Sequence, residues 1–407
     1  MSVKLPFYQR VVFDRLASIS QGGLTLIDGP QQFFFGDQTS ELQAKVTIHT
    51  PMVYRRFLID AEIGAGVSFA QGEWSSDDLT KVIQFFAKNL SLVDSNHNLI
   101  AKSAMWAYRL WHRFNDNTKN GSQKNIAEHY DLGNEMFKLW LDPAMQYSSA
   151  IFPDQQSSLA DAQQHKLKVI CDKLALKPED HLLEVGTGWG GLACFAAQHY
   201  DCNVTTITIS DQQYQYAKAA IEAQGLTHKV TVLKQDYREL QGKYDKLVSI
   251  EMIEAVGHKH LSHYFNQLSH CLKPTGKMLI QAITIADQRY DYYRNNVDFI
   301  QRFIFPGGSL PSLYEMLKHL RDQSDMTVHK IEDYSLHYAE TLKLWFQRFS
   351  QASSQLKQGG YDDYFQRLWH YYLAYCEGGF REGRLNLIHF EASKVEAKRL
   401  LNPVPHT

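Results

Sequence analysis

The chain has 407 residues, of which 44% are hydrophobic and 21% are charged, and its formal net charge is −2. This length exceeds the size at which a single hydrophobic core usually stops growing, so the sequence predicts two domains. The balanced charge and a pI near 6.8 exclude the strong overall attraction to polyanions that nucleic-acid-binding proteins show.

The first residues of the chain do not resemble a signal peptide. Asp14 and Arg15 interrupt the apolar core that such a peptide needs, and the sequence has no apolar run of about 18 residues. We therefore expect a cytoplasmic protein. The five cysteines form no CxxC pair, which predicts buried thiols and neither a disulfide framework nor a metal site.

Residues 23–70 alternate β-forming residues with turn signals, a pattern that predicts a short antiparallel sheet. An amphipathic helix is expected after it, over residues 74–90, with Ser75 or Ser76 as its N-cap. Residues 1–95 are therefore predicted to be a small α+β domain.

Residues 96–125 are predicted to be a helix followed by a linker. Trp106, Trp111 and Phe114 recur near helical spacing, and Arg109 and Arg113 lie between them. Two interpretations stay open. The aromatic side chains lie in a lipid headgroup layer, or they pack between the two domains.

After about residue 160 apolar runs of strand length alternate with helical segments, as in HLLEVG, NVTTITIS, VTVLKQD, YDKLVSIEMI and GKMLIQAITI. This alternation predicts a doubly wound, largely parallel sheet within a domain over residues 126–407. The runs over 327–336 and 386–392 are expected to add edge strands.

The segment LLEVGTGWGG places glycines directly after one predicted strand and before a helix. Gly186 and Gly188 permit a tight turn and close ligand approach. By itself this motif also fits a dinucleotide-binding fold or a plain strand-to-helix connection.

Polar residues follow the next two strands. Thr208, Ser210 and Gln213 are suited to bind a ribose or methionine group, and Asp236 is suited to accept from an adenine amino group. The carboxyl ends of such strands are where an open α/β sheet binds its ligand. The pattern resembles class I S-adenosylmethionine (SAM)-dependent methyltransferases more than dehydrogenases, although a structural role for Ser210 or Gln213 stays open.

Five further segments, over 129–152, 249–265, 299–313, 337–345 and 372–383, resemble cyclopropane fatty acid synthases and the related mycolic acid methyltransferases, in the order of that family. IEAVG and IFPGGSLPSL point to its plant-like bacterial subgroup. The resemblance implies a class I methyltransferase fold, with a seven-stranded, mostly parallel Rossmann-like sheet, extra helices and a small N-terminal domain. The implied activity is transfer of a methyl(ene) group from SAM to the cis double bond of an unsaturated phospholipid, which yields a cyclopropane fatty acid.

The resemblance also implies site residues. The SAM-binding positions are Tyr147, Ser148, Glu184, Gly186, Gly188, Trp189, Thr208, Ser210, Gln213 and Asp236, and Tyr130 lines the same site. The implied base is a bicarbonate ion, held by the side chains of Glu254 and Tyr338 and by the backbone of Ile283.

The sequence departs from the family near this ion. Ser149 and Gln281 stand where the family commonly has cysteine and histidine. The family uses the backbone at the first position, so serine is compatible with it. Glutamine can donate through its amide but cannot take up a proton as imidazole does.

The implied chemistry needs a base and a dry pocket. Methyl transfer to an alkene generates a carbocation, and the ring closes when a proton leaves the new methyl group. Aromatic rings, for which Tyr130, Tyr147, Tyr338 and Phe303 are candidates, stabilise positive charge and exclude water.

Three alternatives remain open. They are a lipid methyltransferase that stops at a methyl-branched or methylated unsaturated chain, a methyltransferase for a soluble small molecule with an N-terminal dimerisation domain, and a noncatalytic lipid-binding protein. For the leading interpretation we expect a peripheral contact with the inner face of the membrane, a possible homodimer and no nucleic-acid partner.

Overall fold

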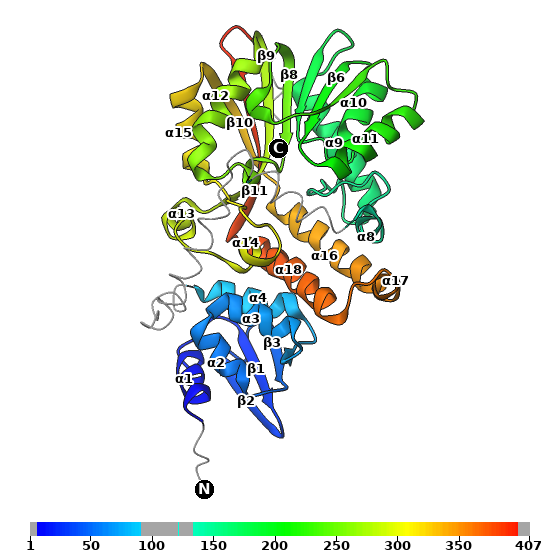
Figure 1. Ribbon diagram of the computed structural model, residues 1–407. Coiled ribbons are helices and arrows are strands. Elements are labelled where there is room, and N and C mark those ends of the chain that lie inside the picture. The colour runs from blue at the N-terminus through cyan, green and yellow to red at the C-terminus, as the bar shows by residue number, and fades with distance from the viewer. Residues whose placement is uncertain (1–5, 91–120, 122–132, 398–407) are drawn as a thin grey trace.

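The computed structural model describes residues 6–90, 121 and 133–397. Figure 1 shows a large sheet with its helices in the upper part and a small sheet with its helices in the lower part. The helices α16 (Ser335–Gln351) and α18 (Asp363–Arg381) lie between them. Tyr130 and the predicted helix with Trp106, Trp111 and Phe114 fall outside the described residues.

The large sheet has seven strands in the order β10-β11-β9-β8-β5-β6-β7. Neighbouring strands from β9 to β7 pair in parallel, whereas β11 runs antiparallel to both of its neighbours. The bounds are β5 (His181–Val185), β6 (Asn203–Thr208), β7 (Val230–Lys234), β8 (Tyr244–Ile250), β9 (Leu272–Ile285), β10 (Met326–Asp333) and β11 (Leu385–Lys394). The predicted doubly wound, mostly parallel sheet is confirmed. The prediction that β11 forms an edge was wrong, because β10 covers it.

Helices cover both faces of this sheet because successive strand residues point to opposite sides. Leu182 and Leu279 pack with α9 (Leu159–Leu174) and α10 (Gly191–Tyr200). Their neighbours Leu183 and Ile280 pack with α12 (Leu261–Cys271) and α15 (Leu313–Gln323) on the other face. The remaining elements of this part are α8 (Asn134–Lys138), α11 (Asp211–Ala223), η1 (Tyr237–Glu239), η2 (Ile253–Ala255), η3 (His258–His260), α13 (Asp287–Tyr293), α14 (Phe299–Phe303) and α17 (Ser353–Gln358).

The small sheet has the strand order β2-β1-β3-β4, with β1 (Gly23–Asp28), β2 (Gln31–Gly36), β3 (Gln43–Ile48) and β4 (Trp74–Ser75). It is mixed, because β1 pairs in parallel with β3. The expected antiparallel sheet was therefore only partly right. Among the described residues, four helices accompany it, namely α1 (Phe7–Leu16), α2 (Met52–Ile59), α3 (Ala61–Ala70) and α4 (Leu79–Lys88).

Two local predictions in this region were wrong. Residues 55–69, expected to extend the sheet, form most of α2 and α3. Tertiary packing decides this: an added Cβ at Gly66 would lie 2.3 Å from the ring of Phe299, so α3 approaches α14 closely. The N-cap of α4 is Asp78, which accepts from the backbone of Lys81, and not Ser75 or Ser76.

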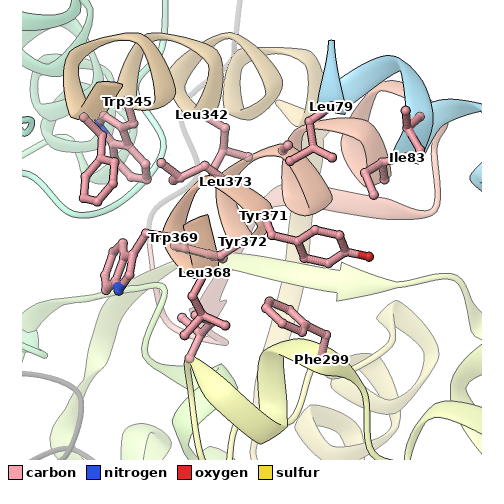
Figure 2. Packing of buried hydrophobic residues seen from close by; sticks show 14 of the residues in the cluster. Leu79, Ile83, Phe299, Leu342, Trp345, Leu368, Trp369, Tyr371, Tyr372 and Leu373 are labelled. Atoms are coloured by element: carbon pink, nitrogen blue, oxygen red, sulfur yellow. The ribbon is translucent and has the colours of Figure 1, made fainter. Parts of the chain in front are cut away.

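Helix α18 joins the two parts of the structure. Figure 2 shows Leu79 and Ile83 of α4 beside α18, and Phe299 of α14 facing Tyr371, with the two ring centroids 4.7 Å apart. Two polar contacts flank this apolar packing. Thr80 Oγ1 donates to Glu377 at 3.0 Å, and the amide of Gln84 donates to Glu382 at 2.7 Å.

Within the described residues, none of the helices is both long enough and apolar enough to cross a bilayer.

Candidate active site

A cavity of about 680 Å³ opens at the carboxyl ends of the parallel strands. Its lining includes Gly186, Thr208, Asp236 and Glu251, which follow or end β5, β6, β7 and β8. The cavity continues past α18 into the N-terminal part, where its lining includes Leu26, Val46, Trp74, Ile83 and Phe86. One end of the cavity is therefore polar, and the other is lined mainly by apolar side chains together with Arg15, Ser18 and Glu62.

The glycine loop forms the wall of the polar end. Gly186 and Gly188 have φ angles of 105° and 52°, in the region that favours glycine. A Cβ added at Gly188 would meet no protein atom within 4 Å, so this position faces open space. The loop thus leaves room at Gly188 for a ligand to approach the backbone.

The polar residues predicted at the end of β6 have two different roles. Thr208 and Gln213 line the cavity, and Thr208 Oγ1 donates to the side-chain oxygen of Gln213 at 2.8 Å. Ser210 caps α11, where its hydroxyl accepts from the backbone N–H of Gln213. Ser210 therefore has the structural role that the sequence had left open.

Asp236 lines the cavity after β7, and its carboxylate accepts from the backbone and the guanidinium of Arg238. A carboxylate has about four acceptor positions, so a contact with an adenine amino group stays a prediction.

Glu184 is buried and accepts from Thr206 Oγ1 at 2.5 Å. Burial raises the pKa of Glu184 to about 8.

A cluster of aromatic rings adjoins the glycine loop through Phe137, which packs against both Tyr147 and Trp189. The ring of Tyr147 packs against Trp140 and Trp345, and its hydroxyl lies 3.0 Å from that of Tyr372. Trp189, which follows the loop, donates from its indole to Asn134 at 2.8 Å. The predicted positions Tyr147 and Trp189 therefore bound the same cavity.

A buried lysine that the sequence interpretation missed lies beside Ser148. Lys166 donates to the hydroxyl of Ser148 at 2.8 Å and to the side chain of Gln146 at 3.1 Å. Burial lowers the pKa of Lys166 to about 8, although the nearby carboxylates, led by Glu251, oppose this shift. From the sequence alone, Lys166 of α9 could not be distinguished from an ordinary exposed lysine on a helix.

The predicted anion-binding residues converge on a second missed residue, Glu251. Its Oε1 accepts from the backbone N–H of Ser149 at 2.8 Å and from the amide of Gln281 at 2.7 Å. Its Oε2 accepts from the hydroxyl of Tyr338 at 2.8 Å. Three groups expected to surround one bound ion thus bind a carboxylate of the protein.

The two side chains predicted to hold one bicarbonate ion, Glu254 and Tyr338, have different partners in this structure. Tyr338 donates to Glu251, whereas Glu254 accepts from the backbone N–H of Ile283. The backbone explains the difference, because Glu251 has a φ of 48° directly after β8. This conformation, uncommon for residues other than glycine, accompanies a carboxylate that lines the cavity.

A polar chain behind Gln281 fixes the direction of its amide. Burial lowers the pKa of His389 well below its ordinary value, so the ring is neutral. Lys173 lies 2.9 Å from Nδ1, and Nε2 lies 2.9 Å from the oxygen of Gln281. Lysine can only donate, so Nδ1 of His389 is the acceptor and Nε2 carries the ring proton. Nε2 therefore donates to the side-chain oxygen of Gln281, and the NH₂ group of Gln281 is directed toward Glu251.

The two neighbouring carboxyl groups differ in their surroundings. Burial raises the pKa of Glu251, and its hydrogen bonds with Ser149, Gln281 and Tyr338 oppose that rise. Burial and the charge of Glu251 raise the pKa of Glu254 to about 8. Glu254 therefore holds its proton at neutral pH, and the three hydrogen bonds to Glu251 favour the ionised form of that carboxyl group.

Known proteins resemble this chain over most of its length. The family described as mycolic acid cyclopropane synthetase matches residues 117–390. The chain is 37% identical to the tuberculostearic acid methyltransferase UfaA1 of Mycobacterium tuberculosis over 84% of this chain and 81% of that protein. It is also 37% identical to the cyclopropane-fatty-acyl-phospholipid synthase of Escherichia coli, over 84% of this chain and 86% of that protein.

Solved structures give the same result. The structure resembles the cyclopropane synthase MmaA2 from Mycobacterium tuberculosis with a TM-score of 0.63 and 28% identity, over 67% of this chain and 98% of that one. It resembles the mycolic acid cyclopropane synthase CmaA1, complexed with SAH and CTAB, with a TM-score of 0.62 over the same shares. The chain therefore belongs to the mycolic acid cyclopropane synthetase family of SAM-dependent methyltransferases.

Proposed function

We propose that this enzyme transfers a methyl group from SAM to the cis double bond of an unsaturated phospholipid acyl chain and closes a cyclopropane ring. The observation that carries this proposal is a single cavity that joins the glycine loop to a carboxylate and then to an apolar, aromatic-lined extension. SAM supplies an electrophilic methyl group beside the glycine loop. Gly186, Gly188, Thr208, Gln213 and Asp236 are the residues proposed to hold it.

The apolar extension of the cavity fits a long acyl chain better than a small polar substrate. Between the glycine loop and the N-terminal part, its wall includes the rings of Tyr147, Phe305, Tyr371 and Tyr372. Such rings stabilise a carbocation through their faces and exclude water that would add to it. Beyond α18, side chains of the small sheet and α4 provide further apolar lining.

The proposed substrate is embedded in a membrane, so the enzyme is proposed to bind the inner membrane face peripherally. The segment with Trp106, Trp111 and Arg109 is the predicted contact. Dimerisation through the N-terminal part stays a further prediction.

Bicarbonate, the base that the resemblance implied, does not fit the described residues in this arrangement. The donors of Ser149, Gln281 and Tyr338 are already bonded to Glu251. A second anion on these donors would be repelled by the Glu251 carboxylate. We therefore do not propose bicarbonate as the base, and the dependence of turnover on added bicarbonate tests this.

A methyl-branched or methylated unsaturated chain without a ring is the second candidate, favoured by the 37% identity with a tuberculostearic acid methyltransferase. Both products require transfer of the label from methyl-labelled SAM to unsaturated phospholipid vesicles. We expect label in the lipid fraction with unsaturated vesicles and none with saturated vesicles of the same headgroup. Equal labelling of both, or labelling of a soluble acceptor alone, would contradict the proposed substrate.

A further inference from the structure

Glu251 accepts hydrogen bonds from three residues that the sequence had placed around an external anion. Its two carboxylate oxygens receive three hydrogen bonds, from the backbone of Ser149, the amide of Gln281 and the hydroxyl of Tyr338, with lengths of 2.7 to 2.8 Å. The carboxylate also lines the cavity, so it faces the space proposed for the reacting double bond. A carboxylate with this orientation offers the same kind of oxygen base as bicarbonate.

We propose that the carboxylate of Glu251 is the catalytic base of this enzyme and replaces an external bicarbonate ion. This inference rests on the proposed methyl transfer to an alkene. The π electrons of the double bond form a bond to the methyl carbon, the bond from that carbon to sulfur breaks, and S-adenosylhomocysteine leaves. The other alkene carbon is then a cation.

One C–H bond of the new methyl group next breaks. Its proton passes to an oxygen of Glu251, and its electron pair forms the second ring bond to the cationic carbon. Glu251 ends the step as a neutral carboxylic acid and returns its proton to solvent after the product leaves. The overall reaction releases one proton and needs neither an oxidant nor a reductant.

The surroundings of Glu251 suit this role. The three donors fix the carboxylate before the reaction, which lowers the cost of reorganisation. The Lys173–His389–Gln281 chain holds one of those donors in place. Lys166 supplies a nearby positive charge. The raised pKa of Glu251 makes its carboxylate a stronger base than an exposed one.

The backbone of Glu251 provides a way to test the inference. A φ of 48° is readily adopted by glycine, so Glu251→Gly removes the carboxylate and relieves the backbone. The donors of Ser149, Gln281 and Tyr338 then face a space of carboxylate size. Glu251→Gln instead keeps the side-chain volume but removes the base.

The experiment uses the full-length enzyme with methyl-labelled SAM and unsaturated phospholipid vesicles. Wild-type turnover is expected to be unchanged when bicarbonate is removed under carbon-dioxide-free gas. Both Glu251→Gln and Glu251→Gly are expected to lose about 100-fold or more in turnover. Formate or bicarbonate restores part of the activity of Glu251→Gly but not of Glu251→Gln, whose site remains filled.

Three results would overturn the inference: wild-type activity that requires bicarbonate, a Glu251→Gln variant with wild-type turnover, or equal rescue of both variants. The SAM affinity and the melting temperature of each variant show whether it is folded. The measurement of wild-type turnover with and without bicarbonate tests the inference even if a variant does not fold. If the wild type labels no lipid at all, the proposed function itself fails. If it labels lipid only with bicarbonate, only the assignment of Glu251 fails.

Discussion

Nε2 of His389 lies 2.9 Å from the side-chain oxygen of Gln281, on the side of the amide that faces away from Glu251. Both residues are fully buried. Since water cannot replace the histidine there, His389 determines which end of the Gln281 amide reaches the carboxylate. His389 is therefore a positioning residue that acts through Gln281.

We expect His389→Leu to lower kcat while leaving the Kd for SAM nearly unchanged. The Gln281 oxygen loses its donor, which costs about 1–3 kcal/mol of stability and allows the amide to turn. Steady-state kinetics, SAM titration and thermal unfolding check this, with the exposed His199→Leu as the matched control. A loss of stability without any change in kcat would show that His389 only contributes to packing and does not position Gln281 for the reaction.

Glu254 predicts a dependence of stability on pH. Its pKa is about 8 in the folded protein and 4.5 ordinarily, so between these values the unfolded chain releases a proton that the folded protein keeps. Stability from this group is therefore present at low pH and is lost as the pH rises from about 4.5 to about 8. Glu254→Gln cannot ionise, so its melting temperature relative to wild type should rise between about pH 5 and about pH 8. A difference that is constant with pH would show that Glu254 is ionised when folded.

The glycine loop offers a matched pair of substitutions. Gly188 and Gly225 have φ angles of 52° and 69°, and an added Cβ at either meets no atom within 4 Å. Only Gly188 lines the cavity. We expect both valine variants to lose about 1–3 kcal/mol of stability through backbone strain, and only Gly188→Val to lose SAM binding. Calorimetric titration decides this, and unchanged SAM affinity in folded Gly188→Val would remove the loop from the cofactor site.

The predicted membrane contact is tested by replacing Trp106 and Trp111 together with serine. If these rings lie in the headgroup layer, cosedimentation with vesicles falls more than SAM affinity does. Equal loss of both, together with a lower melting temperature, would favour packing between the two parts of the chain.

The sequence predicted the cavity wall at the strand ends better than the surroundings of Glu251. The glycine loop and the strand ends at Thr208 and Asp236 follow from local pattern, because parallel strands bring their carboxyl ends together. Glu251 was missed because its role depends on a left-handed φ and on groups about 30 to 100 residues away, as the separations in its hydrogen bonds show.

The N-terminal part shows the same limit of local pattern. The run RRFLIDAEIGAGVSF is apolar enough for a strand, but α3 forms there because it packs against α18 and α14. The closeness of Gly66 to Phe299, more than 200 positions later in the chain, is a tertiary contact that no local window contains.

The most direct measurement is NMR of the lipid product made from SAM that carries ¹³C in its methyl group, with unsaturated phospholipid vesicles as the acceptor. Ring closure predicts that the labelled carbon carries two hydrogens and is bonded to two adjacent chain carbons, at the high-field position of a cyclopropane methylene. A labelled carbon bonded to only one chain carbon, as a methyl group on an alkene or as an exocyclic methylene, would contradict ring formation and establish a methylated unsaturated product instead.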